Sequence, residues 1–204
     1  MPSIYDVKPA FQNLLRPLVR FLARRSVSAN QVTITAVLLS LAVGGVILRW
    51  PDLRWPLLSL PLALFLRMGL NAIDGMLARE HSMKTNLGGI LNELGDVISD
   101  SAMYLPFAMI TGISVPLVVI VVVLAVIGEM IGVAAIQVAG LRRYDGPMGK
   151  SDRAFVFGSL ALALGLGFRA YFWVNLTLAM VILLLLLTIF NRVHQALKGA
   201  TIEN

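Results

Sequence analysis

The sequence has few of the residues on which soluble and disulfide-linked proteins depend. Cysteine is absent, which excludes disulfide bonds and thiolate metal sites, and only two histidines are present. Charged residues make up 14% of the chain, whereas soluble domains contain about a quarter. Apolar residues reach 58%. This composition excludes an ordinary soluble domain and predicts a membrane protein that crosses the bilayer several times.

Six apolar segments follow one another along the chain, each near the ~20 residues that span a bilayer. Prolines and charged stretches between them mark turns. We therefore expect an all-α membrane protein with six transmembrane helices. The segments are residues 32–48, 55–77, 87–111, 115–139, 154–168 and 171–190.

Lysine and arginine are distributed unequally between the two sides of this arrangement. The side that holds both termini and the loop at 79–86 carries 13 of the 17 basic residues. Because cytoplasmic segments carry the positive excess, we expect both termini in the cytoplasm. The net charge of +6 then reflects topology and contact with anionic lipids, and nucleic acid is not an expected partner. A bacterial cytoplasmic (inner) membrane suits such a chain.

Residues 1–29 differ from the transmembrane domain expected at 30–204. Apolar residues recur at helical spacing from Phe11 to Leu22, while three arginines form a stripe on another face. This pattern favours an interfacial amphipathic helix on the cytoplasmic leaflet. A soluble arm that packs against the helix bundle is the alternative. No stretch typical of a signal peptide precedes the first span, so we expect the chain to begin in its mature form.

Polar residues gather on one face of each of two neighbouring segments. Steps of three or four residues place them in two helical stripes, and a short loop makes the two helices antiparallel neighbours. Ionisable residues inside a membrane indicate a functional site. The stripes consist of Arg67, Asn71, Asp74 and Ala78, and of Gly88, Asn92, Asp96 and Asp100.

The chemistry of these stripes favours a hard cation and a phosphate group. Carboxylate and amide oxygens suit Mg²⁺ or Mn²⁺, which complete their coordination with water and substrate phosphates. Arg79 adds a fixed positive charge at the cytoplasmic end. Gly75 and Gly88 leave room for close approach of a ligand. A site of this kind suits a substrate with a diphosphate head and a membrane-embedded tail.

These residues resemble the signature of the CDP-alcohol phosphotransferase family, D-x2-D-G-x2-A-R-x8-G-x3-D-x3-D. Every spacing agrees. Six spans and an N-terminal interfacial helix also resemble the architecture of that family, so the likeness covers nearly the whole chain. The corresponding residues here are Asn71, Asp74, Gly75, Ala78, Arg79, Gly88, Asn92 and Asp96.

The resemblance implies a metal-dependent transferase of phospholipid synthesis that works as a homodimer. An acceptor alcohol would attack a CDP-linked lipid, with CDP-diacylglycerol the expected donor, and CMP would leave. Asp96 occupies the position of the general base. The metal would be held by Asn71, Asp74, Asn92 and Asp96, to which we add Asp100 on the same stripe. The CDP group would be held by Asn30, Thr33, Gly75, Ala78, Arg79 and Gly88.

Two of the four motif aspartates are replaced by Asn71 and Asn92, each of which removes one negative charge. Three interpretations follow from this change. The site uses one Mg²⁺ or Mn²⁺ ion instead of two, Glu93 or Asp100 completes the metal shell, or catalysis is weak or lost. In the last case the chain would be a silent membrane scaffold. A small transporter, which also carries buried carboxylates, is a further alternative.

Two other features allow more than one interpretation. Lys150 and Arg153 begin the fifth segment, where they could hold an anionic group of the acceptor or serve as flanking positive charges. Glu129 lies within the fourth segment, where it could belong to the site or form a buried structural hydrogen bond.

Overall fold

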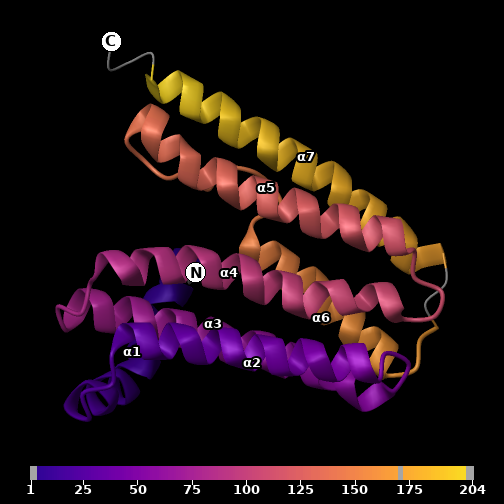
Figure 1. Cartoon of the computed structure of the whole chain (residues 1–204), viewed down its shortest axis with the longest axis horizontal. Coiled ribbons are helices and arrows are strands. Elements are labelled where there is room, and N and C mark those ends of the chain that lie inside the picture. Colours follow the sequence, from indigo (N-terminus) through magenta and orange to yellow (C-terminus); the bar gives the residue numbers. More distant parts are fainter. Residues whose placement is uncertain (1–3, 170–171, 201–204) are drawn as a thin grey trace. The chain divides into compact units, whose positions relative to one another are not determined.

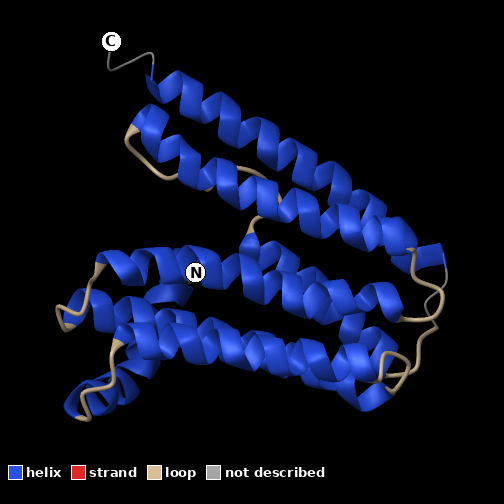
Figure 2. Ribbon diagram, in the orientation of Figure 1, coloured by secondary structure: helices blue, strands red, loops and turns tan. Residues whose placement is uncertain are grey.

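The computed structural model describes residues 4–169 and 172–200, and within these ranges every regular element is helical (Figures 1 and 2). This confirms the expected all-α class. The elements are α1 (Ile4–Arg24), α2 (Ala29–Arg49), α3 (Arg54–Glu80), α4 (Asn86–Tyr104), the 3₁₀ helix η1 (Leu105–Met109), α5 (Val115–Ala139), α6 (Lys150–Gly165) and α7 (Phe172–Ala200).

The expected apolar segments overlap these helices, but their bounds differ: α6 begins and ends earlier than the expected 154–168, α7 continues to Ala200 instead of ending at 190, and the third segment changes its helix type. There the α-helix ends at Tyr104 and the chain continues as η1, although the apolar run extends to residue 111. Pro106 explains the change, because its ring clashes with the preceding helical turn and it has no N–H to donate. Residue 171, the expected start of the sixth segment, lies outside the described residues.

Four of the described helices, α2, α3, α5 and α7, are long and apolar enough to cross a membrane. The chain is therefore an integral membrane protein. Two of the six expected spans fall short of that criterion for different reasons: α4 carries three acidic residues, and α6 has only 16 residues.

The fold divides into two compact units, and the first comprises Met1–Ala42 and Leu62–Ser99. Its core joins three helices through Val19 of α1, Val32 of α2 and Met76 of α3. Packing of α1 against α2 and α3 is the behaviour expected of an arm on the bundle. A second apolar stripe of α1, which includes Leu14 and Leu18, stays exposed, as an interfacial helix requires.

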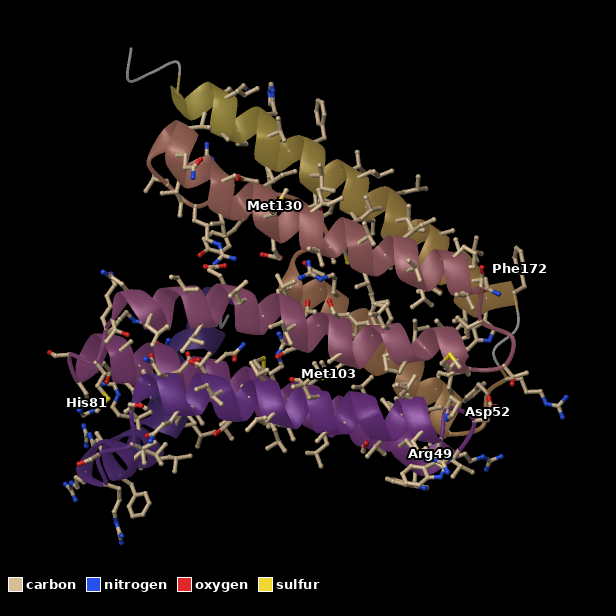
Figure 3. All side chains as sticks on the ribbon, in the orientation of Figure 1. Arg49, Asp52, His81, Met103, Met130 and Phe172 are labelled. Atoms are coloured by element: carbon tan, nitrogen blue, oxygen red, sulfur yellow. The ribbon has the colours of Figure 1, made fainter. Side chains whose placement is uncertain are left out.

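The second unit comprises Val43–Pro61 and Asp100–Asn204. Within it α5 and α7 lie side by side (Figure 1). Phe157 of α6 stacks on Tyr104 with ring centroids 4.1 Å apart. Asp52, labelled in Figure 3, ties the α2–α3 loop to Thr111 by accepting hydrogen bonds of 2.9 and 3.1 Å. Exposed apolar side chains such as Phe172, at 76% exposure, suit contact with lipid.

Candidate metal and phosphate site

The polar faces of α3 and α4 oppose each other in the first unit, as their spacing predicts. Arg67 Nη2 donates a hydrogen bond of 3.1 Å to the main-chain oxygen of Asp96 and lies 3.5 Å from its Oδ1. Asn71 Nδ2 donates to the same Oδ1 at 3.3 Å. The Arg67 side chain is only 3% exposed. Asp96 therefore faces a buried cation and an amide donor from α3.

Asp74 lies one turn nearer the α3–α4 loop and is 6% exposed. Thr33 of α2 places its hydroxyl 2.8 Å from Asp74 Oδ2 and 3.1 Å from the main-chain oxygen of Ala29. A hydroxyl has a single proton, and the charged oxygen at the shorter distance is the stronger acceptor. Thr33 thus orients the Asp74 carboxylate from the neighbouring helix.

We predict that Thr33→Val weakens the site without unfolding the protein. The variant removes the hydroxyl that orients Asp74, and loss of such a supporting group typically costs about 10- to 100-fold in metal affinity or activity. Mn²⁺ affinity and CMP release measure the effect. Thr35→Val, on the same helix but exposed and bonded only to Gln31 within it, is the matched control. Equal effects of both variants would contradict the prediction.

The residues expected to hold the CDP group occupy two places in this unit. Arg79 is exposed at the end of α3, and its guanidinium covers Gly75, where an added Cβ would lie 3.2 Å from Nη1. At the start of α4, an added Cβ on Gly88 would lie 2.6 Å from Oδ1 of Asn30. Ala78 is half-buried and packs against the core of the unit. Gly75 and Gly88 thus provide the space that the side chains of Arg79 and Asn30 occupy.

The donor set is consistent with a hard divalent cation but contains fewer charges than the motif of the family. Asp74 and Asp96 supply carboxylates, while Asn71 and the half-buried Asn92 supply amide groups. Within residues 4–169 and 172–200, no group of three or more His, Cys, Asp or Glu side chains is arranged to hold a metal. These residues are compatible with a divalent cation whose remaining ligands would come from water and substrate.

A second polar cluster lies in the second unit, around Glu129 of α5. Arg153 Nη2 lies 2.8 Å from Asp100 Oδ2 and 3.1 Å from Glu129 Oε1. Arg142 Nη2 lies 3.1 Å and Arg192 Nη1 3.6 Å from Glu129 Oε2. Two carboxylates and three guanidinium groups from five segments (α4, α5, the loop after α5, α6 and α7) thus form one network of ion pairs, with one positive charge in excess.

This cluster changes the interpretation of several predicted residues. Asp100, which we expected beside the metal, is buried and paired with Arg153. Arg153 is 2% exposed, so it is not a flanking surface charge. Lys150 begins α6 and is half-buried. Sequence reasoning missed the roles of Arg142 and Arg192, although the carboxylate of Glu129 within an apolar helix required cationic partners.

The fold and the spacing of the α3–α4 residues agree with the resemblance to a family of membrane-embedded transferases. A sequence model of that family, described as CDP-alcohol phosphatidyltransferase, matches residues 26–198. The chain belongs to the CDP-alcohol phosphatidyltransferase family.

Two curated proteins and several solved structures resemble the chain. The inner membrane protein YnbA of Escherichia coli (strain K12) is 44% identical over 96% of both chains. An uncharacterised protein of Aquifex aeolicus (strain VF5) is 27% identical over 97% of this chain and 96% of its own length. Phosphatidylinositol phosphate synthase (PgsA1) of Mycobacterium tuberculosis with CDP-DAG bound gives a TM-score of 0.74 at 20% identity, covering 88% of this chain and 92% of that one. The same enzyme in complex with manganese and citrate also gives 0.74.

Proposed function

We propose that the protein transfers a phosphatidyl-like group from a CDP-linked lipid, CDP-diacylglycerol, to an acceptor alcohol and releases CMP. The observation that carries the proposal is the pairing of α3 and α4, which brings Asn71 and Arg67 onto Asp96 beside the buried carboxylate of Asp74. Membership of the family supports the reaction class. Binding of CDP-DAG by the similarly folded PgsA1 supports the donor.

Each site residue then has a defined task. The acceptor oxygen bonds to the phosphorus distal to cytidine, the bond from that phosphorus to the CMP oxygen breaks, and Asp96 takes the acceptor proton. Arg79 neutralises charge on the diphosphate, because phosphoryl transfer depends mainly on positioning and electrostatics. Asn30, Thr33, Gly75, Ala78 and Gly88 hold and accommodate the nucleotide. A bound Mg²⁺ or Mn²⁺, held by Asp74 with Asn71, Asn92 and Asp96 as further candidates, would stabilise the charge that develops on the phosphate oxygens.

We propose that an anionic group of the acceptor binds to Lys150 and Arg153 at the start of α6. Arg153 already contacts Asp100 and Glu129, so an anion at this position has to compete with one of these carboxylates. An acceptor without an anionic group leaves the polar cluster around Glu129 undisturbed.

The proposal also covers the membrane topology of the chain and the membrane in which it resides. We place α4 and α6 in the bilayer with the four apolar helices, which gives six spans with both termini on the cytoplasmic side. The site then opens to the cytoplasm of a bacterial inner membrane. The name of YnbA supports this membrane, and we expect a homodimer in it.

Purified protein mixed with CDP-diacylglycerol, Mg²⁺ or Mn²⁺ and a panel of alcohols tests the reaction through CMP release. The panel includes glycerol phosphate, inositol phosphate, serine and phospholipids with free hydroxyls. We expect CMP to form with at least one acceptor and only in the presence of the divalent ion. Absence of CMP with every acceptor would favour a silent scaffold, and solute flux in liposomes would favour a transporter.

A further inference from the structure

Arg67 is a buried cation that the family signature does not contain. It lies four residues before Asn71 on the same face of α3, and its side chain is 3% exposed. Nη2 contacts both the main-chain oxygen and Oδ1 of Asp96. Burial of a guanidinium is costly unless a carboxylate compensates it, so the geometry pairs this charge with the candidate general base.

The amide of Asn71 adds a second donor on this side of Asp96. Its Nδ2, a donor, faces Asp96 Oδ1 at 3.3 Å. An ion bridging these two residues would need the amide oxygen at that position. It would also lie close to the positive charge of Arg67, and repulsion between like charges a few ångströms apart is strong in a poorly solvated site.

The charge of the site agrees with this geometry. Asn71 and Asn92 lack the two negative charges that aspartates supply at the corresponding positions of the family signature. Asp74 and Asp96 remain, and Arg67 offsets part of their charge. The protein charge that would balance a second divalent ion is therefore missing from the motif.

We propose that the site binds a single divalent cation at Asp74 and that Arg67 supplies, at Asp96, the positive charge that a second ion would otherwise provide. Arg67 acts through Asp96 as a positioning residue. The proposal rests on the proposed function, since it concerns the same site. With Asn71 and Asn92 neutral, Arg67 balances the remaining carboxylate of Asp96 in place of a second ion.

Mn²⁺ binding to the metal-free, full-length protein tests the proposal without turnover. We expect one Mn²⁺ per chain for the wild type and for Asn71→Asp, because Arg67 pairs with the added carboxylate. The double variant Arg67→Gln, Asn71→Asp is expected to bind a second ion. Arg67→Lys, Asn71→Asp keeps the positive charge and should remain at one.

The matched control combines Asn71→Asp with Arg54→Gln, which removes an exposed arginine at the other end of α3. It should bind one ion. The proposal would be overturned if the wild type bound two ions or none. It would also be overturned if Asn71→Asp and the double variant Arg67→Gln, Asn71→Asp bound the same number of ions. If the double variant Arg67→Gln, Asn71→Asp misfolds, the wild-type count still tests the single-ion site.

CMP release measured on the same samples separates this proposal from the function on which it rests. Two bound ions together with CMP release would contradict the single-ion site and support the transferase. One bound ion without CMP release from any acceptor would support the single-ion site and contradict the transferase.

Discussion

Asp96→Asn is expected to reduce the rate of CMP release by about 10²- to 10⁴-fold, the usual contribution of a general base. The amide keeps the size and the hydrogen-bonding oxygen of the carboxylate. It cannot take the hydroxyl proton of the acceptor alcohol at neutral pH. Because Arg67 and Asn71 both donate to Asp96, the amide oxygen can still receive one of these bonds. Initial rates at saturating donor and acceptor measure the loss.

Glu80→Gln is the matched control for this variant. Glu80 is the residue after Arg79, is exposed, and forms a surface ion pair with Arg16 at 3.2 Å. Such exposed pairs contribute about 0–1 kcal/mol, so this variant should keep its rate and its fold. Equal CMP release by wild type and Asp96→Asn would exclude Asp96 as the base, whatever the effect of the control.

Glu129→Ala is expected to destabilise the second unit severely. The variant removes the carboxylate shared by Arg142, Arg153 and Arg192, and leaves buried guanidinium groups without that partner. Loss of one member of a buried ion pair typically costs about 3–5 kcal/mol. The free energy of unfolding in mixed micelles, from a denaturant titration, measures the cost.

Met130→Ala provides the comparison for Glu129→Ala. Met130 is the next residue of α5 and is exposed (Figure 3), so its truncation changes lipid contact and leaves the ion cluster intact. We expect a change below about 1 kcal/mol, as for surface substitutions in general. An unfolding free energy of Glu129→Ala within that same range would show that the cluster contributes little to stability.

The candidate site could be predicted from the sequence because its residues lie on two adjacent helices. Helical spacing places Asn71 and Asp74 on one face, and Asn92 and Asp96 on another. A loop of a few residues makes the two helices antiparallel neighbours, so local rules were enough to oppose the faces. The contact of Asn71 with Asp96 confirms this pairing.

The arginine cluster could not be predicted in the same way. Its members lie on α4, α5, α6, α7 and the loop after α5, and the spacing within one helix says nothing about which helices pack together. Flanking arginines such as Arg192 look alike in the sequence whether they contact lipid headgroups or enter the protein. Only the tertiary arrangement brings Arg192 to Glu129.

The third apolar segment shows a limit of hydropathy as a guide to helix length. Its apolar run continues past Tyr104, but hydropathy does not record the loss of a backbone N–H at Pro106. The Asp96–Arg67 pair shows a similar limit. The spacing identified Arg67 as a member of the α3 stripe, whereas its partner followed only from the packing of α4 against α3.

The cluster around Glu129 also constrains how the protein is made. A chain emerges from the ribosome with its N-terminus first, so Glu129 is synthesised 13 residues before Arg142 and 24 before Arg153. Arg192 follows later, on α7. Until these arginines arrive, α5 brings an uncompensated carboxylate to the membrane, which is costly there. Compensation of this carboxylate therefore begins with Arg142 and Arg153, and it is complete only once α7 has been synthesised.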